Sequence, residues 1–432
     1  MTDMTSGRPD ADTSSGYRSR AYAARVARRN RSEFWLKSLG LASILVAFGF
    51  LALMLGSLVS TGYKAATQTH VTLDVPLPAD RLKEGDLFGS NWRGIVQDAV
   101  AATLPGLEGP ALREAVGILS NGAQFMIRDR VVANPQLVGS TLTVTVPVSD
   151  PFDQLHKGLI DRATPEANRR VNDRQIALFD QLADAGRITS PINWGILTNA
   201  DSRFPELAGL RGAITGTVWL LLTCFAICFP IGIGAAIYLE EFAPRNRLND
   251  FIEVNINNLA AVPSVVFGLL ALAVFLNWFG LPRGAPFVGG LTLALMSLPT
   301  IIIATRAALK AVPPSIREAA LGMGASRQQV VFHHVLPLAM PGILTGTIIA
   351  MAQAIGETAP LLLIGMNAFI TAVPEGAFSA ATTLPTQIFI WADSPERGFV
   401  SRTSAAILIL LAVLVMMNAL AIYLRNRFER RW

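Results

Sequence analysis

Residues 317–337 read REAALGMGASRQQVVFHHVLP, a short segment rich in Ala and Gly that lies between two long apolar runs. Just upstream, Pro313 and Pro314 stop any helix that runs in from the preceding segment. Ser315-Ile-Arg-Glu318 has the spacing of an N-terminal capping box, so a new helix is expected to begin at Ser315. Gly324 is a natural end for this helix because glycine accepts a positive φ without strain.

A second short helix is predicted directly after the first, since Ser326-Arg-Gln-Gln329 repeats the capping-box spacing. Ala319 and Ala320 give the first helix a face with almost no side chain, which allows another protein to approach its backbone closely. The segment is therefore interpreted as a docking element between two apolar runs. The alternative is an interfacial connector that only joins membrane spans. The neighbouring His333 and His334 do not have the spacing of a metal site.

The rest of the chain has the composition of a membrane protein. It has 432 residues, of which 51% are hydrophobic and 16% are charged, and its mean hydropathy is +0.43. Soluble proteins contain about 25% charged residues. Several stretches lack Asp, Glu, Lys and Arg, and each could hold a membrane helix of about 20 residues. These stretches are Ser38–Tyr63, Gly212–Leu239, Val254–Pro282, Gly284–Thr305, Gln328–Gly356 and Thr403–Leu424. We expect an all-α polytopic membrane protein with six transmembrane helices.

The arginines at the two ends of the chain orient this protein. Arginine-rich segments precede the first apolar run and follow the last, and positive charge favours the cytoplasmic side. Both termini are therefore expected in the cytoplasm, and the net charge of +5 is assigned to lipid headgroups rather than to nucleic acid. The expected organisation is a basic tail (1–37), a retained anchor helix (38–63), an extracytoplasmic domain (64–211), a helical core (212–424) with a cytoplasmic loop (306–341), and a second basic tail (425–432).

The segment 64–211 is expected to form a compact α+β domain. HVTLDV (70–75) and TLTVTVPV (141–148) alternate apolar and polar residues, as half-buried strands do. Helical spacing is present in residues 91–104 and 172–186. The domain shows no group of residues with the spacing of a catalytic or metal site.

The docking element resembles the EAA loop of bacterial ABC-importer permeases. The resemblance lies in Glu318-Ala319-Ala320, the glycine at position 324 and Leu336-Pro337. In that family the loop forms a coupling helix that seats in a groove of the ATP-hydrolysing subunit. The resemblance thus implies an ATPase-coupling role for Arg317, Glu318, Ala319, Ala320, Gly324, Ala325 and Ser326. One departure is His334, where the family usually has a branched aliphatic residue.

Further stretches resemble the A-type permease subunits of phosphate-specific (Pst) importers. They are PIGIGAAIYLEEFAP (230–244), VPSVVFGLLAL (262–272), AIGETAPLLL (354–363) and TTLPTQIFIWADSP (382–395). The resemblance implies a type I importer core of the MetI-like class in the bacterial inner membrane. It also implies partners: a second, PstC-type permease, a dimer of PstB-type ATP-binding subunits and a periplasmic PstS-type phosphate-binding protein. The sequence contains no G-x-x-x-x-G-K-[ST] loop, so we expect no enzyme activity and no cofactor in this chain.

Glu357 is the strongest candidate for a residue in the translocation pathway. It interrupts an otherwise uncharged stretch, and ionisable residues at membrane depth usually face a cavity or a partner. Gln353 is expected one turn earlier on the same helix face, where the family often has an arginine, and Thr358 adds a further polar side chain. The alternative is that Glu357 only caps or braces a helix break before Pro360.

The predicted function is a permease subunit that couples ATPase movement to the import of inorganic phosphate. Two alternatives stay open. The chain could serve an importer for another oxyanion or small solute, or it could be a membrane-anchored sensor whose outer domain binds the ligand.

Overall fold

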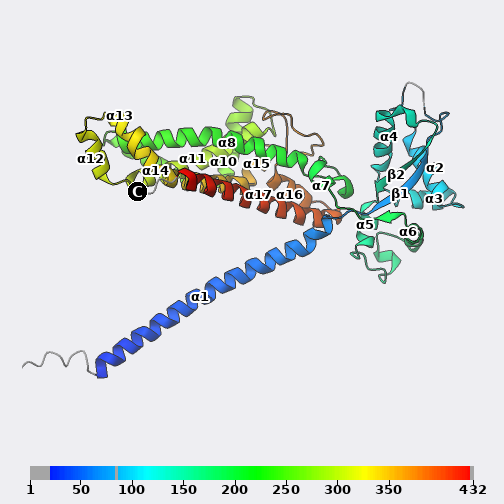
Figure 1. Cartoon of the computed structure of the whole chain (residues 1–432), viewed down its shortest axis with the longest axis horizontal. Helices are drawn as coiled ribbons and strands as arrows, with labels where there is room; N and C mark the ends of the chain where they lie inside the picture. The colour runs from blue at the N-terminus through cyan, green and yellow to red at the C-terminus, as the bar shows by residue number, and fades with distance from the viewer. Residues whose placement is uncertain (1–19, 83–85, 429–432) are drawn as a thin grey trace, which may run out of the picture. The chain divides into compact units, whose positions relative to one another are not determined.

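The computed structural model describes residues 20–82 and 86–428 (Figure 1). Residues 1–19 of the expected N-terminal tail and residues 429–432 of the expected C-terminal tail lie outside the described residues. The described part is mainly helical, with one small antiparallel sheet.

The first of two compact units, Met1–Val59, holds most of helix α1 (Arg20–Gly62), and the second unit is Ser60–Trp432. Helix α1 has 43 residues and is long and apolar enough to cross a membrane. Its apolar side chains surround the helix instead of forming one stripe, as expected where lipid contacts every face. The helix covers residues 38–62 of the predicted anchor, and Tyr63 begins the short 3-10 helix η2 (Tyr63–Ala65).

The α+β domain of the second unit is built on strand β1 (His70–Pro76), whose alternate residues are buried. Strand β1 pairs antiparallel with β2 (Thr141–Pro147) on one edge and with β3 (Ile188–Thr189) on the other. The strand order is therefore β2-β1-β3. The predicted strands 70–75 and 141–148 are confirmed, whereas β3 is too short to show an alternating pattern in the sequence.

Helices cover this sheet and complete one hydrophobic core. The predicted helices 91–104 and 172–186 are present as α2 (Trp92–Thr103) and α6 (Asp173–Asp184). An asparagine side chain caps the N-terminus of each by accepting a hydrogen bond from a backbone N–H, which explains where the helices begin. The domain also contains α3 (Gly109–Val116), α4 (Ala123–Ala133) and α5 (Asp150–His156), and two short helices, α7 (Gly195–Thr198) and η5 (Pro205–Leu207), lead out of it.

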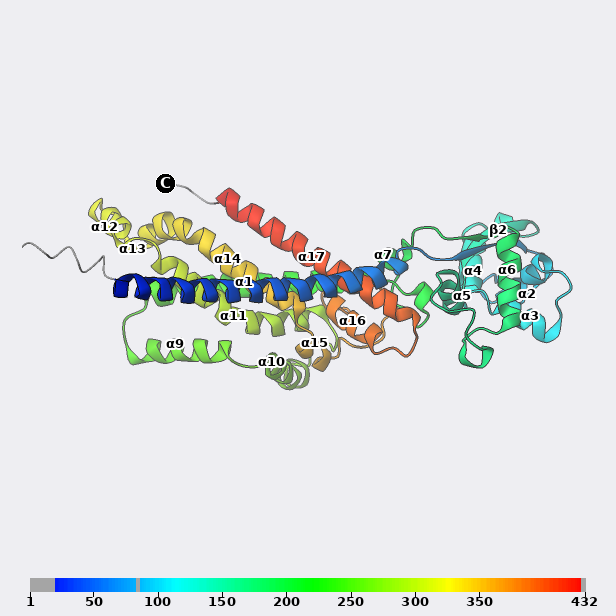
Figure 2. The same cartoon turned by 90° about the horizontal axis from the view of Figure 1, so that it is seen from below.

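The helical core follows from residue 211 onward. Helix α11 packs against both α8 and α14, and α17 packs against α14 and α16 (Figures 1 and 2). The long helices are α8 (Arg211–Ile237), α11 (Pro286–Lys310), α14 (Leu336–Gly356) and α17 (Gly398–Phe428), and the short ones are α12 (Pro314–Gly322), α13 (Arg327–Gln329), α15 (Ala359–Leu363) and α16 (Leu384–Ala392). Within residues 20–82 and 86–428, five helices are long and apolar enough to cross a membrane.

The apolar run Val254–Pro282, which was expected to hold one membrane helix, is bent in the structure. The structure breaks it into α9 (Arg247–Ala260) and a second segment, α10 (Ser264–Leu270) with the π-helical η7 (Ala271–Trp278), at an angle of 106°. The break lies at Pro263, which has no N–H to donate and disfavours helical backbone in the residue before it. If this bent pair crosses the membrane as one span, the described residues hold six spans.

Small residues allow the core helices to lie very close together. A Cβ on Gly346 would lie 2.2 Å from the Cβ of Ala304, and one on Gly342 would lie 2.7 Å from the Cβ of Ala308. The two glycines of α14 therefore face two alanines of α11 at the same four-residue spacing. Such small-residue contacts are typical of helix pairs in membranes, where backbones approach closely.

Candidate functional site

The docking element is formed by α12 and α13, but α12 begins differently from the prediction. The helix begins at Pro314 with Pro313 as its N-cap residue, and no side chain caps it. The predicted capping box of Ser315 and Glu318 is therefore wrong. Proline is common at the first position of a helix, where a backbone N–H would have no acceptor within the helix. Pro314 therefore moves the helix start one residue upstream.

The end of α12 and the start of α13 agree with the prediction. Gly324 has a φ of +87°, and its N–H donates to the carbonyl of Leu321 at 2.9 Å. The N–H of Ala325 donates to the carbonyl of Ala320 at 3.1 Å, which completes a Schellman motif. The capping box of Ser326 and Gln329 is present, with both reciprocal hydrogen bonds formed. The turn between the two helices thus has its backbone groups satisfied locally.

The small-residue face of α12 is divided between the protein interior and the surface. Ala320 is 2% exposed and belongs to a hydrophobic cluster with residues of α11, α14 and the π-helical η8 (Val330–Val335). Ala319, in contrast, is exposed. Beside it, the side chains of Leu321 and Met323 are 48% and 79% exposed. Ala319 and Met323 are one turn apart on the same exposed side of α12, whereas Leu321 is exposed on another side, and the sequence analysis missed both larger residues.

Arg317 points away from this exposed face and holds α12 in place. Its guanidinium donates to the carboxylate of Glu241 at 2.8 Å and to the carbonyls of Val312 and Leu309 at 2.6 and 2.9 Å. Glu241 lies in the π-helical η6 (Tyr238–Phe242), which continues α8. Arg317 thus ties the start of α12 to the ends of α8 and α11.

A second group of ion pairs lies at the same end of the core. Arg306 of α11 pairs with Glu240 at 3.3 Å and with Glu253 of α9 at 2.9 Å. Lys310 lies 3.5 Å from Glu240. The sequence shows these charges at the ends of apolar runs, but partners more than fifty positions apart cannot be matched without the fold.

The remaining residues of the docking element lie at the surface. Glu318 and Ser326 are exposed, Ala325 is half-buried, and both His333 and His334 are exposed on η8. Across the described residues, no group of His, Cys, Asp and Glu is arranged to hold a metal ion. An exposed His334 does not disturb the packing of the loop.

Glu357 lies at a break between two helices. Helix α14 ends at Gly356, Glu357 has extended backbone with a φ of −75° and a ψ of 125°, and α15 begins two residues later. Glu357 is the C-cap residue of α14 and the chain leaves the helix directly after it, so the shared face of Gln353 and Glu357 stays a prediction. Gln353 is exposed, and Glu357 and Thr358 are half-buried.

The carboxylate of Glu357 forms no hydrogen bond or ion pair within the described part of the chain. It does not cap α15, because Thr358 is the N-cap residue and no side-chain hydrogen bond is formed there. The break is held instead by packing: a Cβ on Gly268 of α10 would lie 2.7 Å from the Cα of Pro360. Glu357 is half-buried, and a carboxylate without a partner in a membrane-spanning segment usually faces a cavity or a basic group of another subunit.

The described residues thus form the apolar helical core of a membrane-spanning protein, with a break beside Glu357 and a short, partly exposed helix, α12. The sequence matches the family of binding-protein-dependent transport system inner membrane components over residues 229–432, and a domain of unknown function, DUF3333, over residues 23–166. The chain belongs to this inner membrane component family, and within it to the PstA-type permeases of ABC importers. It is thus a multi-pass inner-membrane permease and not an enzyme, because ATP hydrolysis in this family resides in separate subunits.

Individual relatives extend the similarity beyond the family model. The probable ABC transporter permease protein YqgI of Bacillus subtilis is 30% identical over 226 residues, which cover 50% of this chain and 76% of the relative. The phosphate transport system permease protein PstA 2 of Mycobacterium bovis is 34% identical over 255 residues, covering 57% of this chain and 80% of the relative. Among solved structures, an inward-facing MetNI methionine ABC transporter matches 51% of this chain and 96% of its own with 19% identity and a TM-score of 0.41.

Proposed function

We propose that the chain is the transmembrane permease subunit of an ATP-driven importer for inorganic phosphate. The observation that carries this proposal is the similarity to PstA permeases of several bacteria, at 34% identity over 80% of the Mycobacterium bovis protein and 32% over 71% of the Yersinia pestis protein. The unpaired carboxylate at the break between α14 and α15 supports a polar pathway through the core. An importer for another oxyanion or small solute is the second candidate.

The docking element is proposed to receive movement from the ATPase. The exposed side chains of Ala319 and Met323, one turn apart, form a small apolar surface that can enter a groove of an ATP-binding subunit, and Leu321 is exposed on another side of the helix. Arg317 and Ala320 serve the same function indirectly, because their contacts fix α12 on the core. Glu318 adds an exposed charge to the element, and Gly324, Ala325 and Ser326 form the tight turn and the N-terminal cap between the two helices.

The translocation pathway is proposed to pass the break at Glu357, with Gln353 and Thr358 as polar lining. Phosphate is an anion, so an ionised Glu357 facing it alone would repel it. We infer that a basic residue of a second permease subunit pairs with Glu357 in the assembled transporter. Gln353 then offers phosphate an uncharged hydrogen-bonding group.

The assembly proposed is that of a phosphate importer. It contains a second, PstC-type permease, a dimer of PstB-type ATP-binding subunits and a periplasmic PstS-type phosphate-binding protein. The two permeases lie in the lipid bilayer. A PstC protein of Pasteurella multocida is 34% identical over 204 residues, which supports pairing with a permease of similar fold. Both termini are proposed to lie in the cytoplasm and the α+β domain on the opposite side, as the arginine-rich flanks indicate.

Reconstitution of the complex in lipid vesicles tests the substrate. ATP hydrolysis should rise when the binding protein is loaded with phosphate and should not rise with sulfate. Stimulation by sulfate but not by phosphate would establish the other-oxyanion alternative. A control complex whose ATP-binding subunits cannot hydrolyse ATP shows how much of the measured ATP hydrolysis does not come from the transporter.

A further inference from the structure

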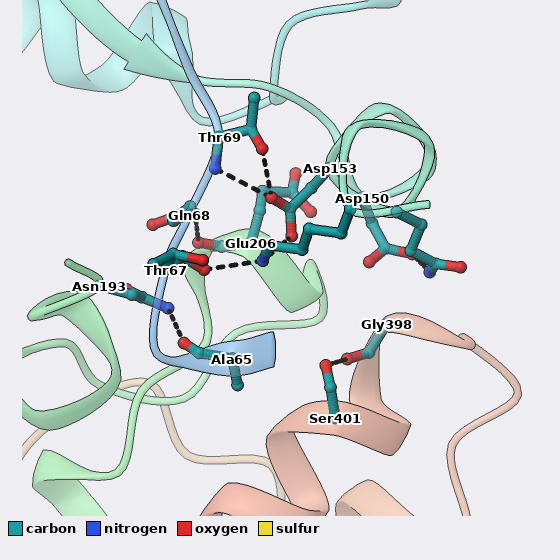
Figure 3. A network of polar contacts seen from close by, with 12 residues as sticks. Ala65, Thr67, Gln68, Thr69, Asp150, Asp153, Asn193, Glu206, Gly398 and Ser401 are labelled. Atoms are coloured by element: carbon teal, nitrogen blue, oxygen red, sulfur yellow. Dashed lines mark hydrogen bonds and ion pairs between the residues drawn. The ribbon is translucent and has the colours of Figure 1, made fainter. Parts of the chain in front are cut away.

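The α+β domain meets the beginning of α17 through charged side chains that are buried. Asp150 and Glu206 are 8% and 6% exposed, and Arg402 of α17 is 6% exposed. Figure 3 shows Asp150, Asp153 and Glu206 gathered near Gly398 and Ser401 at the start of this helix. We call this group the charged junction, and it consists of Asp150, Asp153, Lys157, Arg170, Glu206 and Arg402.

Hydrogen bonds fasten the junction to the chain segment that enters the α+β domain. Lys157 donates to the carboxylate of Asp153 and to the carbonyl of Thr67, both at 2.7 Å. The same carboxylate accepts from the backbone N–H of Thr69 at 2.9 Å. These contacts join the C-terminal end of α5 to the segment that leads into β1 (Figure 3).

The charged junction contacts the first turn of α17 directly. A Cβ on Gly398 would lie 1.8 Å from Oδ1 of Asp150, so only a glycine leaves room for this carboxylate. Arg402, one turn further along the helix, donates to the carbonyl of Ala208 at 2.7 Å. Arg170 bridges Asp150, at 3.7 Å, and Glu396, at 2.7 Å, just before the helix begins. A carboxylate at the N-terminus of a helix is also favoured by the helix dipole.

An apolar layer lies next to these charges and joins the same segments. The rings of Trp391 and Phe399 pack in a tilted arrangement with centroids 5.6 Å apart. Around them lie Ala65, Ile196, Ala208, Leu210 and Ala406, which come from the entry to the α+β domain, from its exit and from α17. The start of α17 is therefore enclosed by the two connections of the domain.

Carboxylates are crowded in this buried place, and the charged groups facing Asp150 come from several elements. They are Asp153 and Lys157 on its own helix, Arg170 from the following loop, Glu206 from η5 and Arg402 from α17, while Glu396 lies behind Arg170. Burial, and then the nearby carboxylates of Glu206 and Asp153, raise the pKa of Asp150 to about 6. Burial likewise raises the pKa of Glu206.

The sign of the resulting pH dependence follows from these shifts. An acid whose pKa is higher in the closed junction than in an opened one binds a proton preferentially in the closed state. The closed state is the junction with all the contacts described above. Protonation of Asp150 stabilises this state fully below about pH 4, and the stabilisation is lost as the pH rises through about 6. The junction should be tighter in mild acid than at neutral pH.

We propose that the charged junction positions α17 against the α+β domain, and that Asp150 and Glu206 are positioning residues whose protonation tightens this hold. The α+β domain is then a proton-sensitive brace on the last long helix of the permease core. The proposal does not depend on phosphate being the substrate.

Hydrogen–deuterium exchange of the intact complex tests the proposal. In the wild type, peptides covering 66–70 and 399–404, corrected for intrinsic exchange, should be about tenfold better protected at pH 5 than at pH 7.5. Asp150→Asn should lose most of this difference, because asparagine keeps the shape of the side chain but does not titrate. Asp184→Asn is the matched control, since Asp184 is exposed at the end of α6 and should leave the wild-type difference unchanged.

Two further measurements complete the test. Glu206→Gln should reduce the pH difference as well, and it serves as the second variant if Asp150→Asn does not accumulate. ATP hydrolysis by the complex without added substrate should change near pH 6 in the wild type and lose this change in Asp150→Asn. Protection that is independent of pH in the wild type, or a wild-type response in both variants, would overturn the proposal. Failure of phosphate to stimulate the complex would refute the proposed substrate and leave this result standing.

Discussion

Arg317 has a contact pattern that differs from that of the other residues in the docking element. Its guanidinium reaches one carboxylate and two backbone carbonyls, and its side chain is only 23% exposed. Carbonyls at the end of a helix have no partner within that helix, so a guanidinium donor at this place satisfies them. Arg317 therefore fixes the position of α12, and we expect it to affect docking only through that position, whereas the exposed Ala319 can contact another subunit directly.

Arg317→Met should lower the free energy of unfolding of the full chain in detergent by about 2 kcal/mol, because a partly buried ion pair and two hydrogen bonds are lost. The measurement is equilibrium unfolding in SDS. In a double-mutant cycle with Glu241→Gln, the two changes should cost less together than the sum of their separate costs. Arg327→Met, at an exposed arginine of α13, is the control. Equal stability of Arg317→Met and the wild type would show that the pair adds nothing.

Glu357→Gln should reduce phosphate uptake by the reconstituted complex at least tenfold without lowering its expression. The carboxylate has no partner within the described residues, so its removal should leave the fold intact and affect only the pathway. Uptake at normal expression is the readout, and thermal unfolding of the purified chain shows that the fold is unchanged. Uptake equal to that of the wild type would remove Glu357 from the mechanism.

At the scale of the element, α12 shows how neighbouring alanines can have different functions. Ala320 packs into a hydrophobic cluster of the core, and Ala319 lies at the surface next to Leu321 and Met323. Substitutions at the two positions should therefore separate docking from folding.

Ala319→Asp should abolish copurification with the ATP-binding subunit and leave the unfolding midpoint of the chain unchanged. Ala320→Asp should lower that midpoint strongly, because a buried aspartate without a partner costs several kcal/mol. Ala311→Asp, an exposed alanine just before α12, is the matched control and should retain the ATPase. Copurification of Ala319→Asp at the wild-type level would place the docking surface elsewhere.

Local signals in the sequence predicted elements well where a single feature decides the conformation. The second capping box at Ser326 and the positive φ of Gly324 needed no tertiary contact. The first capping box failed because Pro314 competed with Ser315 for the helix start. The bend at Pro263 was missed because the apolar run continues through it. The ion pairs of Arg306 and Arg317 depend on the fold, which no local signal contains.

At the scale of the molecule, the α+β domain is inserted through two adjacent connections. His70, where β1 begins, is paired with Thr189, where β3 ends, so the chain enters and leaves the sheet at the same place. Residues 190–210, however, contribute to the apolar layer beside α17. A deletion that is meant to spare the core must therefore keep both connections.

Replacing residues 70–189 by a two-glycine linker should leave a chain that still copurifies with the ATP-binding subunit. Neighbouring strands lie about 5 Å apart, so a short linker can join the cut ends. A membrane-anchored sensor would lose all ligand response in this deletion, whereas a permease should retain ATPase binding. A deletion of 64–209, which also removes the apolar layer, should be less stable. If the chain that lacks residues 70–189 no longer binds the ATP-binding subunit, the permease core does not fold or dock separately from the α+β domain.

One continuous stretch of helix connects the docking element to the break at Glu357. Helical backbone runs from Val330 through η8 and α14 to Gly356. At 1.5 Å per residue this stretch of helix is about 40 Å long. A tilt of about 3° at the docking end would displace the far end by roughly 2 Å, close to the difference between a formed and a broken hydrogen bond. The small-residue contacts with Ala304 and Ala308 place no large side chain between α14 and α11, so we expect a small movement at the docking end to change the surroundings of Glu357.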